Sequence, residues 1–148
     1  MYEYRCTIIK IIDGDTVDVD VDLGFDIVLR GLRIRVFGID TPESRTSNAL
    51  EKKFGLAAKH KVESLIPVGS SQILKTTKDR DGGDKKGKFG RILGDFKVEY
   101  AGESALLTDI MIDDCFAVRY HGQNKADVEA EHLTNRDVLI DKGIVTLE

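Results

Sequence analysis

The sequence has little cysteine, and its histidines are dispersed. Two cysteines, Cys6 and Cys115, are too few for a disulfide framework. There is no CxxC pair and the three histidines are scattered, so a tetrahedral Cys/His zinc site is not supported. We therefore expect both cysteines to behave as small buried apolar residues.

Long apolar runs are also missing. No stretch approaches the roughly 20 consecutive apolar residues that span a membrane as a helix. The N-terminal residues include Glu3 and lack a small-residue cleavage site, so they do not resemble a secretory signal. We expect no membrane partner, an intracellular location, and a single globular domain over residues 1–148.

The net charge of −4 disfavours a protein that coats nucleic acid nonspecifically, because such proteins are basic overall. The charge is unevenly distributed along the chain. Residues 75–91 carry seven basic and three acidic side chains, whereas residues 99–148 carry eleven acidic and four basic ones. The basic tract fits either a solvated loop or an arm that grips phosphates, and composition alone leaves both open.

Hydrophobic periodicity predicts five strands and three helices. The strands are expected at residues 3–12, 15–22, 26–39, 71–78 and 89–99, with a bulge or corner at Gly31. The helices are expected at residues 47–66, capped by Ser47 or Asn48, around 104–114, and at 125–142, capped by Asn124. Short strands with glycine-marked bends suit an α+β, mainly β fold, a five-stranded OB-fold Greek-key barrel with helices outside.

Five aspartates lie within ten positions of the segment KIIDGDTVDVDVDLG, residues 10–24. An EF-hand calcium loop is excluded, because neither register supplies the required glycine and glutamate. Alternation with valine puts Asp18, Asp20 and Asp22 on a solvated strand face. Asp15 instead shares the inward face of the valines, where a carboxylate needs a cation or an arginine beside it. Asp15 is therefore the member of this run that we expect in a site.

A second acidic cluster, DTPE at residues 40–43, follows the third predicted strand. Arg33 and Arg35 precede it, and Arg91 lies in the fifth predicted strand. Carboxylate and carbonyl oxygens suit hard cations, and the planar guanidinium pairs with two phosphate oxygens at once. Phosphodiester cleavage needs a metal, a base for water and cations for the developing charge. The residue types for that chemistry are present, although composition does not show that they converge.

Three stretches together resemble the staphylococcal (thermo)nuclease family: IIDGDTV at 11–17, RIRVFGIDTPE at 33–43 and KFGR at 88–91. Their order and spacing match that family over most of residues 5–120. The resemblance implies an OB-fold barrel and calcium-dependent hydrolysis of DNA or RNA. It implies cleavage of the 5′ P–O bond, which leaves 3′-phosphate ends on single-stranded or locally unpaired substrates.

The resemblance also assigns roles around one calcium ion. The carboxylates of Asp15 and Asp40 and the backbone carbonyl of Thr41 would be ligands of the ion. Asp13 and Thr16 would support these ligands without binding the ion themselves.

Catalysis is assigned to three residues by the same resemblance. Glu43 would orient or deprotonate the attacking water. Arg35 and Arg91 would clamp the scissile phosphate and stabilise the transition state.

Substrate contacts depart from the family pattern. Phe89 stands where the family usually has a tyrosine, so one hydrogen bond to a substrate phosphate is missing. Tyr120, with His121 beside it, is the aromatic residue available for a base or sugar, and Arg119 replaces part of that contact. The other expected substrate-binding residues are Lys85, Lys86 and Lys88.

Two alternatives to an active nuclease remain at this stage. One is a nuclease-like module that binds nucleic acid or protein without cleaving, and the other is a structural virion or interaction domain. Degenerate modules lose acids or arginines, whereas this chain fills all six positions: Asp15, Arg35, Asp40, Thr41, Glu43 and Arg91. We therefore expect an active, monomeric nuclease like the short intracellular members encoded by bacteria, phages or plasmids.

Overall fold

The computed structural model describes residues 2–77 and 91–147. Its strands are β1 (Tyr2–Asp13), β2 (Thr16–Asp22), β3 (Val28–Val36), β4 (Ile39–Asp40), β5 (Ser71–Thr76), β6 (Ile92–Tyr100), β7 (Glu103–Leu106) and β8 (Val118–Arg119). Its helices are α1 (Ala49–Leu65), α2 (Leu107–Asp113) and α3 (Lys125–Asp141). Within these residues no helix is long and apolar enough to cross a membrane.

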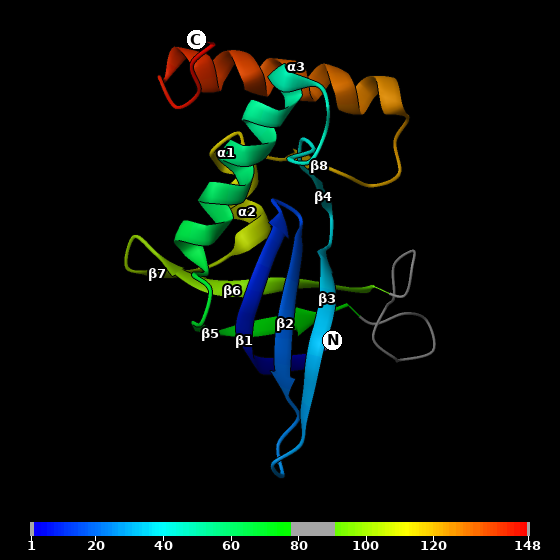
Figure 1. The fold of residues 1–148 in the computed structure, drawn as a ribbon, viewed down its shortest axis with the longest axis vertical. Helices are drawn as coiled ribbons and strands as arrows, with labels where there is room; N and C mark the ends of the chain where they lie inside the picture. Colours follow the sequence, from blue (N-terminus) through cyan, green and yellow to red (C-terminus); the bar gives the residue numbers. More distant parts are fainter. Residues whose placement is uncertain (1, 78–90, 148) are drawn as a thin grey trace.

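Five strands close into a barrel. β1 pairs antiparallel with β2 and β5, β2 pairs with β3, and β5 pairs with β6. A parallel pairing of residues 34–36 of β3 with residues 92–94 of β6 completes the ring. Figure 1 shows the helices gathered at one end of this barrel, with α3 the element farthest from it. The predicted α+β, mainly β fold with an OB-type barrel is therefore confirmed.

The alternation in β2 orients its side chains as the sequence predicts. Asp18 and Asp20 lie on the outside, where they form ion pairs with Arg33 and Arg30 at 2.8 and 3.1 Å. The inward residues of β2 are at most 3% exposed: Val17, Val19 and Val21. The period of two thus fills the barrel interior with β-branched side chains.

Gly31 forms the predicted bulge in β3. The register between β2 and β3 shifts between Val19 and Val21, and Gly31 has a φ of +67°. Its N–H donates to Oδ1 of Asp20 at 2.8 Å, which satisfies the backbone group that the bulge removes from the ladder.

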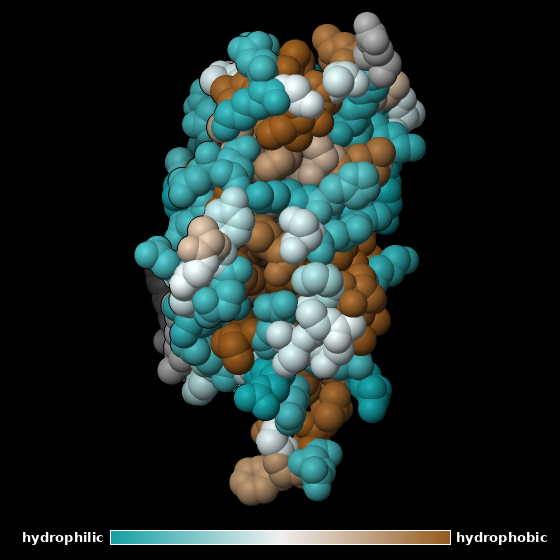
Figure 2. All heavy atoms as spheres, turned by 90° about the vertical axis from the view of Figure 1, so that its left-hand side faces the viewer, coloured by the Kyte–Doolittle hydropathy of each residue, from teal (hydrophilic) through white to brown (hydrophobic). Residues whose placement is uncertain are grey.

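The hairpin between β2 and β3 protrudes from the barrel at the end away from the helices (Figures 1 and 2). Phe25 and Asp26 make its tip with φ values of +54° and +61°. The exposed apolar side chains of this hairpin are Leu23, Phe25, Ile27, Val28 and Leu29.

The predicted third strand, residues 26–39, is divided in the structure. The N–H of Phe37 donates to the carbonyl of Gly94 at 2.8 Å, and Gly38 then turns the chain with a φ of +86°. Ile39 and Asp40 form the separate strand β4, which pairs with β8. The apolar pattern runs on through this break, because both parts are buried on one side.

The predicted short helix at residues 104–114 begins too early. Residues 103–106 form β7, which pairs with β6 through a turn at Ala101 and Gly102, and helix α2 starts at Leu107. Strand β5 also ends at Thr76, two residues before its predicted end. The other helices agree with the prediction, and Asn48, not Ser47, caps α1.

The cysteines differ in their burial. Cys6 is 1% exposed, and burial raises the pKa of its thiol to about 11. Cys115 is only partly buried, because it occupies the turn after α2 with a φ of +65°. The prediction of a buried residue is therefore wrong for Cys115.

Helix α1 touches two chain segments closely. A Cβ atom at Gly55 would collide with the backbone carbonyl of Glu43, and a Cβ atom at Gly14 would lie 2.8 Å from Cβ of Ala58. Both glycines therefore allow backbone to lie directly against the helix. The contact with Gly55 fixes the backbone of Glu43 against α1.

Replacing Gly55 by alanine tests this contact. Alanine improves helix propensity by about 1 kcal/mol, but overpacking typically costs about 1–3 kcal/mol. We expect Gly55→Ala to lower the free energy of unfolding measured in urea. His60→Ala, an exposed change on the same helix, should stay within about 0.5 kcal/mol of the parent. A Gly55→Ala protein as stable as the parent would contradict the close approach.

Candidate active site

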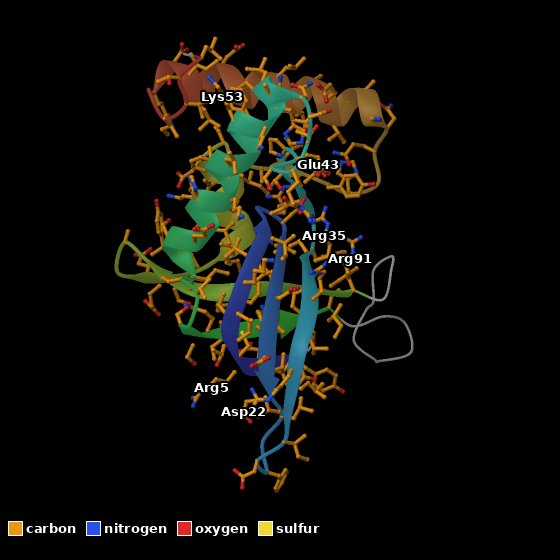
Figure 3. All side chains as sticks on the ribbon, in the orientation of Figure 1. Arg5, Asp22, Arg35, Glu43, Lys53 and Arg91 are labelled. Atoms are coloured by element: carbon orange, nitrogen blue, oxygen red, sulfur yellow. The ribbon has the colours of Figure 1, made fainter. Side chains whose placement is uncertain are left out.

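The predicted site residues of the barrel converge where β2 begins and β3 ends. Nη2 of Arg35 lies 3.5 Å from Oδ2 of Asp15 and 3.9 Å from Oδ1 of Asp40. The same guanidinium donates to the carbonyls of Val36 and Ile39 at 2.6 and 2.8 Å. Four oxygens therefore set the orientation of Arg35. Figure 3 shows Arg35, Arg91 and Glu43 toward the same end of the barrel.

Asp15 is held from two sides. Oδ2 accepts the backbone N–H of Thr41 at 3.2 Å, and Oδ1 accepts the hydroxyl of Thr16 at 3.1 Å. Its side chain is 13% exposed and lies beside an arginine. This agrees with the inward position predicted from the strand alternation, because a buried carboxylate needs a cation next to it. Thr16 thus contacts Asp15 directly.

Asp13 acts on a different segment. The hydroxyl of Ser44 donates to Oδ1 of Asp13, and Nη2 of Arg45 lies 3.2 Å from Oδ2. These contacts tie the loop after Glu43 to the end of β1. Sequence reasoning did not identify Ser44 or Arg45, because neither belongs to a motif with its own chemistry.

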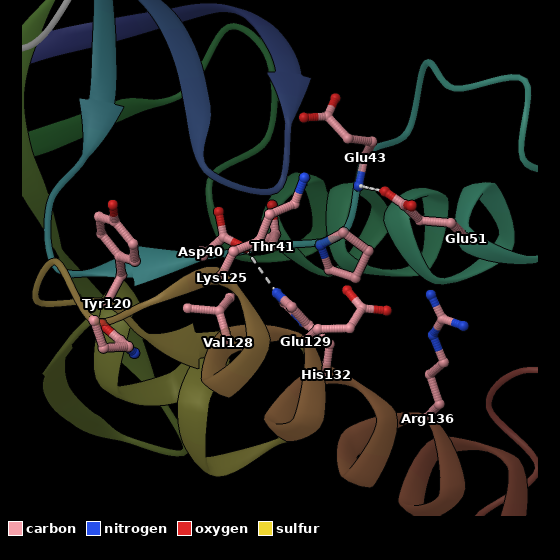
Figure 4. A pocket seen from close by; sticks show the side chains of 12 residues that line it. Asp40, Thr41, Glu43, Glu51, Tyr120, Lys125, Val128, Glu129, His132 and Arg136 are labelled. Atoms are coloured by element: carbon pink, nitrogen blue, oxygen red, sulfur yellow. Dashed lines mark hydrogen bonds and ion pairs between the residues drawn. The ribbon is translucent and has the colours of Figure 1, made fainter.

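Glu43 lies on the loop between β4 and α1. Its side chain is exposed, and its backbone N–H donates to Oε2 of Glu51 at 3.1 Å (Figure 4). Partial burial, followed by the negative charges of Asp13, Asp15 and Glu51, raises the pKa of Glu43 above its ordinary value; Arg45 opposes this shift.

Two cavities meet at Asp40 and Tyr120. The first, about 770 Å³, has an arginine-rich wall that includes Arg35, Arg91 and Arg119. The second, about 520 Å³, lies between residues 40–43 and α3 (Figure 4). The arginines and Tyr120 thus line one continuous surface beside the acidic residues. The expected contacts Lys85, Lys86 and Lys88, and Phe89, fall outside the described residues.

The oxygens here suit a hard cation. Asp15 and Asp40 both approach one guanidinium nitrogen, so their carboxylates point to a common region that tolerates positive charge. The hydroxyl of Thr41, the residue after Asp40, is buried without a hydrogen-bond partner. In residues 2–77 and 91–147 no group of three His, Cys, Asp or Glu side chains is placed to hold a metal. Two carboxylates and a carbonyl would therefore leave positions for water or substrate oxygens.

His132 is a site residue that sequence reasoning missed. Its Nε2 lies 2.7 Å from Oδ2 of Asp40, and the residue is 7% exposed (Figure 4). The two residues are 92 positions apart, and a single histidine in an acidic helix gives no recognisable signal. No pattern in the sequence would have paired it with Asp40.

Comparisons with known proteins identify the family of this chain. A family profile described as staphylococcal nuclease homologue matches residues 33–138. Micrococcal nuclease of Shigella flexneri is 29% identical over 82% of this chain and 62% of its own. The SPbeta prophage-derived endonuclease YokF of Bacillus subtilis (strain 168) is 31% identical over 59% of this chain and 26% of its own. Protein ParB of Escherichia coli is 34% identical over 62% and 41%, respectively.

This chain therefore spans between 26% and 62% of the length of these relatives. The expected family is confirmed by the match, and the expected enzyme class agrees with the names of the two nucleases.

The pKa of Glu43 offers a test of this geometry in the metal-free protein. Because partial burial and then the neighbouring carboxylates raise that pKa, Glu43 should stay protonated to a higher pH than an ordinary glutamate. Glu51→Gln removes one of these charges, so the titration midpoint of Glu43 should move to lower pH. Carboxyl ¹³C NMR titration measures it, with Glu63→Gln as the control on the same helix. An unchanged midpoint in Glu51→Gln would show that Glu51 does not act on Glu43.

Proposed function

The chain belongs to the staphylococcal nuclease homologues, and from this we propose that it is a calcium-dependent nuclease acting on DNA or RNA. The observation that carries the proposal is the convergence of Asp15, Arg35 and Asp40 beside Glu43. This arrangement joins oxygen ligands, a phosphate-binding cation and a base in one place. We also propose that residues 1–148 form one domain and act as a monomer.

The carboxylates of Asp15 and Asp40 and the carbonyl of Thr41 would hold one Ca²⁺. The ion would polarise the scissile phosphate as a Lewis acid. Thr16 and the N–H of Thr41 keep Asp15 in place for this role. Asp13 supports the site less directly, through the loop that carries Glu43.

Glu43 would accept the proton of the attacking water. A raised pKa makes its carboxylate a stronger base. The water attacks phosphorus and the 5′ P–O bond breaks. The leaving 5′-oxygen takes a proton from solvent water, so that a 3′-phosphate and a 5′-hydroxyl are formed.

Arg35 and Arg91 would meet the negative charge that grows on the phosphate oxygens. Arg35 is already oriented by the carbonyls of Val36 and Ile39, so little side-chain freedom is lost when it binds phosphate. A cation on Asp15 and Asp40 would take over the neutralisation that Arg35 provides here.

The arginine-lined cavity would take the substrate strand. Tyr120 is 45% exposed and offers a ring on which a base or sugar can stack, with Arg119 beside it. Stacking needs an exposed base face, which favours single-stranded or locally unpaired DNA or RNA. Lys85, Lys86 and Lys88 would add phosphate contacts.

Cleavage of end-labelled single-stranded DNA and RNA tests this function. We expect cleavage in Ca²⁺ and none in EDTA. Glu43→Gln and Arg91→Ala should each lower the rate by about 100-fold or more. Arg33→Ala removes an arginine from the same barrel but outside the site, where it pairs with Asp18, and should leave the rate unchanged.

Intact substrate in Ca²⁺, with binding that Glu43→Gln and Arg91→Ala retain, would instead identify a binding module without catalysis. Equal loss of rate in Arg33→Ala would show that the variants act through folding.

Salt dependence tests the basic tract. Replacing Lys85, Lys86 and Lys88 by glutamine should weaken binding to single-stranded DNA. The slope of log affinity against log salt should fall by about 0.7 for each phosphate that these lysines neutralise. Filter binding across several salt concentrations measures both quantities.

The matched control replaces Lys52, Lys59 and Lys142 by glutamine, which changes the net charge by the same amount elsewhere. An unchanged affinity and slope in the first variant, or equal changes in both variants, would show that the basic tract binds phosphate no better than other lysines do.

A further inference from the structure

The C-terminal part of the chain holds Asp40 at two points. Strand β8 pairs with β4, with Val118 opposite Asp40 and the N–H of Tyr120 bonded to the carbonyl of Gly38 at 2.8 Å. These contacts fix the backbone of Asp40. Helix α3 then reaches its side chain through His132.

The contact between His132 and Asp40 has a defined direction. An ionised carboxylate can only accept, so Nε2 of His132 donates to Oδ2 of Asp40 at 2.7 Å. The other oxygen, Oδ1, faces Arg35 at 3.9 Å. One carboxylate oxygen is thus held by α3, and the other faces the expected ion site.

Helix α3 itself is anchored independently of His132. Leu139 is 2% exposed in the core, and Nδ2 of Asn135 donates to the carbonyl of Ala117 at 3.1 Å. The guanidinium of Arg136 lies 5.2 Å from the ring centre of Phe54 on α1. These contacts place His132 on a fixed support, which a positioning role requires.

We propose that His132 is a positioning residue for metal binding: it fixes Asp40 so that Oδ1 faces the ion. The inference rests on the proposed calcium site. Hydrogen bonds to ligating carboxylates commonly change metal affinity by about 10- to 100-fold. Because coupling is reciprocal, bound calcium also tightens the docking of α3.

The test compares two amide replacements of similar polarity. The side-chain nitrogen of glutamine can reach the place of Nε2, whereas that of asparagine is one methylene too short. We expect His132→Asn to bind Ca²⁺ about 10- to 100-fold more weakly than the parent, and His132→Gln within about threefold. Isothermal titration of the substrate-free proteins measures these affinities.

Amide hydrogen exchange supplies a second measurement. Calcium should slow exchange in α3 of the parent and of His132→Gln, and do so less in His132→Asn. Asn135→Ala removes an anchor of α3 without touching Asp40, so it should keep the parent's calcium affinity. Circular dichroism confirms that each variant is folded.

The possible results separate the two proposals. If the parent does not bind calcium, the proposed function fails together with this inference. If the parent binds and His132→Asn binds equally well, only the role of His132 is overturned. Equal reductions of affinity in His132→Asn, His132→Gln and Asn135→Ala would also overturn it, because α3 docking alone would then explain the effect.

Discussion

The parallel pairing of β3 with β6 is the contact on which the site depends. It closes the barrel at residues 34–36 and 92–94, so Arg35 lies at the point of closure and Arg91 directly precedes it. The N–H of Val36 donates to the carbonyl of Asp15 at 2.8 Å, which brings the start of β2 to the same place. Chain segments far apart in sequence meet there because this pairing closes the sheet.

The conformation of the acidic loop after β4 is set mainly by its contacts with α1 and with the end of β1. Because Gly55 has no side chain, the backbone of Glu43 lies directly against α1. On the barrel side, Asp13 accepts a hydrogen bond from the hydroxyl of Ser44. A base on an exposed loop would lose orientation without such support. The exposed carboxylate of Glu43 therefore stands on a backbone that is fixed from two sides.

Sequence patterns predicted the barrel strands well, because period-two burial is a local property of β2 and its neighbours. The break at Gly38 and the start of β7 were not predicted, since both are decided by pairing with distant strands while the local apolar pattern continues. Motif residues such as Asp15 and Asp40 were recognisable from their order and spacing. His132 was not, because its meaning comes only from a contact across the fold.

The separation of 92 residues between Asp40 and His132 has a consequence in time. A ribosome adds about 5–20 residues per second, so His132 is made on the order of 5 to 20 seconds after Asp40. Once Arg91 has been added, the nascent chain carries Asp40 and both arginines, but His132 follows only 41 residues later. The site is thus completed only after all five barrel strands have been made.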